Sequence, residues 1–71
     1  MYNYSKLIGR IIEFFGNQRN FSKAIEMSEH TVSLKLNNKL AWKQPEIQKT
    51  IEVLKLSESD IPDYFFTKLV Q

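Results

Sequence analysis

The sequence of 71 residues contains no cysteine. Without thiols neither a disulfide nor a thiolate metal site can form, and this absence is typical of proteins from a reducing compartment. The single histidine, His30, leaves too few nitrogen ligands for a structural zinc. We therefore expect no metal, no cofactor and a cytoplasmic location.

Glycine and proline are almost as scarce, with two of each. The sequence contains no repeat, no linker and no alternating run of the kind that predicts strands. Its apolar N-terminal segment is interrupted at helical intervals by Lys6, Arg10 and Glu13, so we expect neither a signal peptide nor a membrane span. We predict one domain over residues 1–71.

What the sequence does have is helical periodicity, with 42% hydrophobic and 13% aromatic residues to fill one core. The first predicted helix covers residues 5–15, with Ser5 as its N-cap and Gly16 as its stop. Its broad apolar face is predicted to consist of Leu7, Ile8, Ile11, Ile12, Phe14 and Phe15.

Further helices are predicted over residues 18–26 with Asn17 as cap, from the N-cap Ser28 to about Asn37, where Asn37 and Asn38 provide a left-handed end, and from Pro45 onward. A short fifth turn is expected near residues 57–60. Most aromatic residues are expected in the core, namely Phe14, Phe15, Phe21, Trp42, Tyr64, Phe65 and Phe66. The predicted fold is all-α, a compact bundle of about five short helices, in which the second and third form a helix-turn-helix.

The formal net charge is only +2, but the charges are unevenly placed. Acidic residues dominate from Ile51 onward, so the middle of the chain carries any basic surface. The bases in the middle are Arg19, Lys23, Lys35, Lys39, Lys43 and Lys49.

Residues 18–39 resemble the helix-turn-helix of phage Cro and lysogeny-repressor proteins. The matching positions are Gln18, Ser22, Met27, Ser28, Thr31, Val32, Ser33 and the exit 36–39. One position departs from the pattern: the family often has Gly at the turn, where this chain has Glu26. Holding a non-glycine residue in the left-handed conformation costs on the order of 1 kcal/mol.

Residues 42–47 and 60–66 resemble a subgroup of this family, the small Cro-like modulators of repression of temperate lactococcal phages. The resemblance implies a lambda-repressor-like fold and a role in the lysis–lysogeny decision inside the bacterial host. It also implies an antirepressor activity, in which the protein binds the lysogeny repressor of the phage directly.

The predicted third helix has one buried and one exposed side, because Val32 and Leu36 are four residues apart and both point inward. The exposed side, which is the candidate surface for a partner or DNA, is predicted to consist of Ser28, Glu29, His30, Ser33, Leu34 and Asn37. Phosphate or rim contacts are predicted for Gln18, Arg19, Lys23, Lys39 and Lys43.

These residues are consistent with two different functions. Serine, histidine and asparagine are able to bind base edges, which favours a Cro-like repressor of operator DNA. Against this, the helix points no lysine or arginine at base edges. An exposed Leu34 beside the carboxylate of Glu29 suits a protein partner better than a DNA duplex. Leu34 is also consistent with an ordinary exposed leucine, and Glu29 with a residue that complements the helix dipole.

An enzyme is the third class. The sequence offers no nucleophile–base motif, no Gly-rich phosphate loop and no metal spacing among its carboxylates. We expect no catalysis and no small-molecule substrate.

Overall fold

The computed structural model describes residues 1–69. Its elements are the helices α1 (Ser5–Phe15), α2 (Gln18–Ala24), α3 (Glu29–Leu36), α4 (Gln44–Val53), the 3₁₀ helix η1 (Glu58–Asp60) and α5 (Ile61–Phe65). This arrangement confirms the predicted all-α bundle of five short helices. Within the described residues, no helix combines the length and the apolar character needed to cross a membrane.

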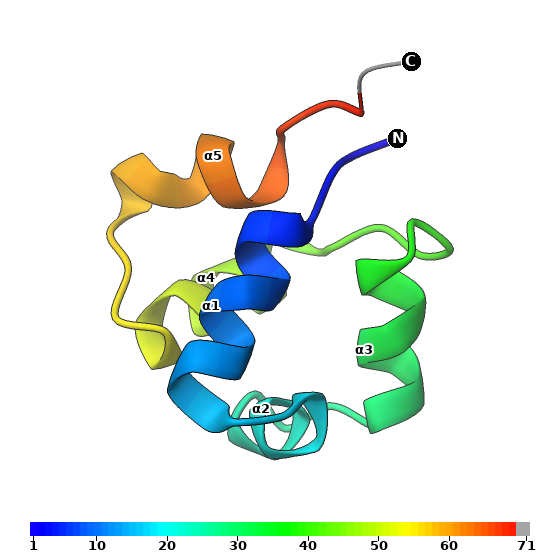
Figure 1. The fold of residues 1–71 in the computed structure, drawn as a ribbon, viewed down its shortest axis with the longest axis vertical. Helices are drawn as coiled ribbons and strands as arrows, with labels where there is room; N and C mark the ends of the chain where they lie inside the picture. The colour runs from blue at the N-terminus through cyan, green and yellow to red at the C-terminus, as the bar shows by residue number, and fades with distance from the viewer. Residues whose placement is uncertain (70–71) are drawn as a thin grey trace.

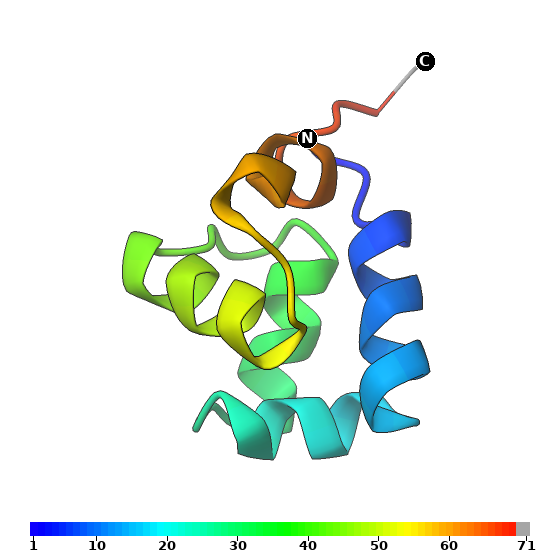
Figure 2. The ribbon, with the colours of Figure 1, turned by 90° about the vertical axis from the view of Figure 1, so that its left-hand side faces the viewer.

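The helices pack around a single hydrophobic core. Helix α2 lies across one end of the molecule, whereas α5, the first residues of the chain and residues 66–69 lie at the opposite end (Figures 1 and 2). The N-terminal segment is joined to residues 67–68 by an isolated antiparallel bridge between Tyr2 and Lys68 and by a 2.7 Å hydrogen bond from Asn3 N to Thr67 O.

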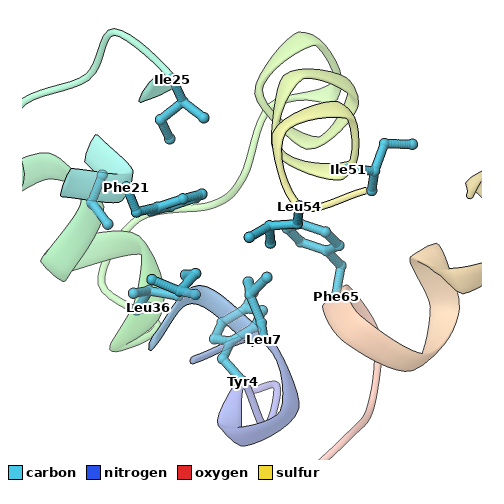
Figure 3. Close-up of a cluster of buried hydrophobic side chains, with 10 residues drawn as sticks. Tyr4, Leu7, Phe21, Ile25, Leu36, Ile51, Leu54 and Phe65 are labelled. Carbon is cyan, nitrogen blue, oxygen red and sulfur yellow. The ribbon is translucent and has the colours of Figure 1, made fainter. Parts of the chain in front are cut away.

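The core receives buried apolar side chains from each of the five α-helices or from the residues that flank them (Figure 3). These residues are Tyr4, Leu7, Ile11, Phe21, Ile25, Val32, Leu36, Ile51, Leu54 and Phe65. Half-buried residues such as Met27, Trp42 and Ile47 pack around this centre. Each helix is held mainly by one buried stripe, as expected for short helices that are marginal in isolation.

Several helix ends lie where local sequence predicts them. The Asn17 side chain accepts a hydrogen bond from Asn20 N at 2.8 Å and caps α2, and Ser57 with Asp60 forms a capping box at η1. Helix α2 ends at Ala24, two residues before the predicted end, because Glu26 adopts a left-handed conformation with φ of 57°. Asn38 is also left-handed, with φ of 61°, as predicted for the end of α3.

Helix α1 corrects two predictions. Ser5 is not its N-cap: Tyr4 occupies that position, and Ser5 N donates instead to Asn3 Oδ1 at 2.9 Å. The apolar face is also narrower than predicted, since only Leu7 and Ile11 are buried within α1. The side chains left exposed are Ile8, Ile12 and Phe14, at 38, 48 and 41% of their surface.

The narrow face of α1 follows from the size of the domain. A chain this short buries only about 60% of its unfolded surface, so neighbouring helices cover one stripe of α1 and not its flanks. The same limit applies to Phe66, which was predicted in the core and is exposed. Arg10 covers part of the exposed Phe14, with its guanidinium carbon 4.2 Å from the ring centre.

Candidate interaction face on α2 and α3

Helices α2 and α3 pack against each other and are joined by a short turn. Glu26 provides the left-handed residue of this turn, and the following Met27 N donates to Ser22 O at 2.9 Å. Ser22 is buried, and its hydroxyl donates to Arg19 O at 2.7 Å. The turn is therefore fixed on both sides, by backbone pairing to α2 and by packing of the half-buried Met27 on the core.

Helix α3 has the orientation that the sequence predicts. Val32 and Leu36 are both buried, so the opposite side of the helix is turned outward. The predicted residues that are exposed are Ser28, Glu29, His30 and Asn37, while Ser33 and Leu34 are half-buried. Six predicted residues thus lie on one helix and its caps, with two of them less accessible than expected.

The partial burial of Leu34 corrects the expectation that this side chain faces solvent. Beyond Asn38 the chain turns back over the last turn of α3, where Lys39 N and Leu40 N donate to Leu34 O at 2.8 and 3.3 Å. This return brings the loop between α3 and α4 close to Leu34. Its side chain keeps part of its apolar surface accessible at the edge of the face.

Several polar groups of the face are already bonded within α3. Asn37 Nδ2 donates to Ser33 O at 2.8 Å, and the Ser28 hydroxyl donates to Thr31 Oγ1 at 2.8 Å while accepting from Thr31 N. These bonds reduce the number of side-chain donors that remain available to a partner. The exposed groups that define the face are then the imidazole of His30 and the carboxylate of Glu29.

Electrostatically, the face contains an ion pair between the two helices. Arg19 Nε of α2 lies 3.4 Å from Glu29 Oε2 of α3, and both side chains are exposed. A second ion pair joins the turn to α4, where Glu26 Oε2 lies 3.7 Å from Lys49 Nζ. Arg19, predicted as a phosphate contact, is therefore placed against an acidic residue of the predicted face.

The remaining predicted rim residues lie on other elements. Gln18 is half-buried at the start of α2, and Lys23 is exposed in the last turn of that helix. Lys39 is exposed beyond the end of α3, and Lys43 is exposed at the N-cap of α4. None of these four residues belongs to the exposed side of α3.

Lys35, one of the bases of the middle segment, does not contribute to a basic surface, because it is buried, at 3% exposure. At about 100° per residue, position 35 lies roughly 60° around the helix from Val32, on the inward side. Its Nζ donates to Ala41 O at 2.7 Å and lies 2.9 Å from Glu46 Oε1. The place of Lys35 on the apolar side is the sequence signal that indicates its burial, although not its pairing with Glu46.

Glu46, the ion-pair partner of Lys35, stabilises the start of α4. Glu46 Oε1 also accepts from Lys43 N at 2.8 Å, which completes the capping arrangement of that helix. Burial alone raises the pKa of Glu46, but the hydrogen bonds from Lys35 and Lys43 and the charges of these two lysines outweigh it and lower the pKa. The carboxylate thus stays ionised and ties α3, the following loop and α4 together.

Comparisons with known proteins cover nearly the whole chain. Residues 1–68 match the family described as Protein of unknown function (DUF739). The solution structure of the modulator of repression of the temperate bacteriophage TP901-1 from Lactococcus lactis is similar, with 53% sequence identity and a TM-score of 0.82. That match covers 97% of this chain and 95% of the other. No curated protein matches.

These matches confirm part of the predicted resemblance. The likeness to a phage modulator of repression, which residues 42–47 and 60–66 suggested, is confirmed at 53% identity. The wider assignment to the Cro and lysogeny-repressor type of helix-turn-helix stays a prediction.

Proposed function

The chain belongs to the DUF739 family, and from that premise we propose that it regulates a phage genetic switch by binding another macromolecule and not by catalysis. Its partner is the lysogeny repressor of the same phage. The exposed side of α3 covers the DNA-binding surface of that repressor, weakens its hold on the operator and favours the lytic state. The 53% identical relative is a modulator of repression of a temperate bacteriophage, which supports this role.

The observation that carries the proposal is the composition of the exposed side of α3. The only lysine of this helix, Lys35, is turned inward, so the exposed side offers no Lys or Arg. It presents instead the carboxylate of Glu29 and part of Leu34. DNA-binding surfaces are basic because they neutralise phosphates. A carboxylate beside apolar surface is complementary to such a basic surface on a repressor.

A second candidate function is direct binding of operator DNA. The observation that favours it is the left-handed turn at Glu26 between α2 and α3, which suits a helix-turn-helix whose second helix enters the major groove. In that case His30 and Ser28 would contact base edges, and the exposed Lys23 would contact phosphate.

Titrations with the DNA-binding domain of the repressor, and separately with operator DNA, distinguish the two functions. Glu29→Lys and Leu34→Lys each place a cation on the exposed side of α3, and each is expected to weaken repressor binding about tenfold or more. Glu52→Lys is the matched control for Glu29→Lys, because Glu52 is exposed on α4 and its replacement brings the same charge change. Circular dichroism verifies that each variant is folded.

One result would reject the antirepressor function. If the isolated protein binds operator DNA tightly and sequence-specifically, and Leu34→Lys leaves that binding intact while the repressor is not bound, then the second candidate function holds.

A further inference from the structure

A hollow of about 390 Å³ opens where the N-terminal segment, the loop between α3 and α4, and α5 meet. We call it the Trp42 hollow, and its main walls are Tyr2, Leu40, Trp42, Ile47, Phe65 and Phe66. A second hollow of about 520 Å³ shares Trp42, Ile47 and Phe66 with it. The segments that form the Trp42 hollow lie at the end of the molecule opposite α2 (Figure 1).

The walls of the Trp42 hollow are held in place by their neighbours. The Trp42 ring meets the buried Phe65 edge to face, with centroids 5.3 Å apart, and Tyr2 meets Phe66 in the same manner at 5.6 Å. The Asn38 side chain accepts from Tyr2 N at 2.9 Å and donates to Tyr2 O at 2.8 Å. A concave apolar site with fixed walls is the usual form of a preformed ligand site.

One polar group of these walls is left without a partner. The indole Nε1 of Trp42 is buried, and it has no hydrogen-bond partner within residues 1–69. An unpaired buried donor is costly, and such groups are uncommon in folded proteins. Because this nitrogen is closed to solvent, it is part of the wall and not a contact point for a ligand, and its resonance reports on changes in the wall.

The charges around the Trp42 hollow indicate the sign of the ligand. In the described residues, the ion pairs engage Lys6, Arg10, Arg19, Lys35 and Lys49. Three lysines outside these pairs gather here: Lys39 lines the hollow, Lys43 follows Trp42, and Lys68 bridges to Tyr2. All three are exposed, so this end of the molecule attracts an acidic partner.

We propose that the Trp42 hollow docks an acidic peptide segment of a partner protein, which inserts one large apolar side chain between the apolar walls. The exposed Leu40 and Phe66 supply apolar surface for that side chain. A second copy of this chain fits less well, because a two-fold interface would set the same lysines against each other. The site adjoins the exposed side of α3 at Leu40 but shares no residue with it, and it does not depend on the antirepressor function.

The single tryptophan provides a specific readout. In ¹⁵N-labelled protein the Trp42 indole gives one side-chain resonance, which is followed while a blocked peptide Asp-Glu-Leu-Phe-Glu-Asp is added. We expect the chemical shift of this resonance to change saturably with peptide concentration, and the affinity to fall as salt is raised. Peptides in which serine replaces the two apolar residues, or lysine replaces the acids, are expected to produce no saturable shift.

Two substitutions test the walls and the charge. Phe66→Ser removes exposed apolar surface and is expected to weaken peptide binding about tenfold, and Lys39→Glu is expected to weaken it about threefold at low salt. Phe14→Ser and Lys55→Glu are the matched controls, since both residues are exposed and neither lines the Trp42 hollow. Both controls are expected to bind as the unchanged protein does.

Four results would overturn the proposal. The first is an indole resonance that does not move at millimolar peptide, and the second is an equal shift in the Phe66→Ser variant. The third is an indole shift that follows protein dilution without peptide, which would identify a second copy as the occupant. The fourth is a larger saturable shift with an oligothymidine than with the peptide, which would identify a nucleic-acid site.

Discussion

The ammonium of Lys35 lies 2.9 Å from a carboxylate oxygen of Glu46, with the lysine almost fully buried. This pair joins α3 to α4 across the intervening loop, and the additional bond from Lys35 to Ala41 O fixes the loop itself. The pair therefore removes the one lysine of α3 from its exposed side and also positions that side.

Replacing Lys35 by Met tests the buried pair. The change leaves Glu46 without its main charge partner, and breaking a buried pair costs about 3 to 5 kcal/mol. We expect a loss of about 3 kcal/mol in the free energy of unfolding, because Glu46 is 22% exposed and regains some hydration. Urea unfolding measures it. Lys49→Met, which breaks the exposed pair with Glu26, is the control and should cost less than about 1 kcal/mol.

The lowered pKa of Glu46 predicts how stability depends on pH. A carboxyl group with a lower pKa in the folded state stabilises the protein above its ordinary value of 4.5, and this stabilisation is lost as pH falls through the folded pKa. We expect Glu46→Gln to be less stable than the unchanged protein at neutral pH and to lose less stability between pH 5 and 3, about the range in which carboxyl groups titrate.

Urea midpoints across that pH range measure the effect, with Glu52→Gln as the exposed control. Some acid sensitivity should persist in the Glu46 variant, because hydrogen bonds from Ser57 also lower the pKa of Asp60. Equal pH profiles for the two Gln variants would contradict a role of Glu46 in acid stability.

The features that sequence predicted best are those that depend on near neighbours. The Asn17 and Ser28 caps each bond a backbone N–H three residues ahead, so the residue type and its spacing are sufficient to predict them. The same holds for the left-handed Asn38 at the end of α3. The inward direction of Val32 and Leu36 follows from helical periodicity alone.

The features that sequence missed depend on residues distant in the chain. The exposure of Ile12 and Phe14 is decided by which side of α1 the other helices cover, and both residues are apolar enough for either side. Leu34 is half-buried because the loop returns to its carbonyl. Lys35 requires a carboxylate eleven residues ahead, and no local pattern signals that pairing.

The left-handed residues allow a matched test of backbone strain. Glu26 and Lys55 have φ of 57° and 58°, and glycine adopts this conformation with less strain. We expect Glu26→Gly and Lys55→Gly to raise the unfolding free energy by about 0.5 to 1 kcal/mol each. Asn38→Gly, at φ of 61°, should instead lower it, because the Asn38 side chain pairs with Tyr2 N and O. Thermal unfolding of the three variants tests this contrast in sign.

The pair between Arg19 and Glu29 gives the sharpest functional prediction. Arg19→Ala frees the Glu29 carboxylate, so we expect two- to threefold tighter binding to a basic repressor surface, about the size of an exposed ion pair. The gain should vanish at high salt, because exposed charges are screened. Lys23→Ala removes a base from the same helix without freeing a carboxylate, and its effect should be smaller.

Fluorescence anisotropy with labelled repressor domain and with labelled operator DNA measures both affinities over a salt series. A DNA-binding protein would respond with the opposite sign, since the loss of Arg19 removes a phosphate contact and reduces both the DNA affinity and its salt dependence. The direction of the Arg19→Ala effect therefore depends on whether Glu29 or Arg19 is the group that meets the partner. Weaker repressor binding in this variant would assign that contact to the arginine and reject the acidic face.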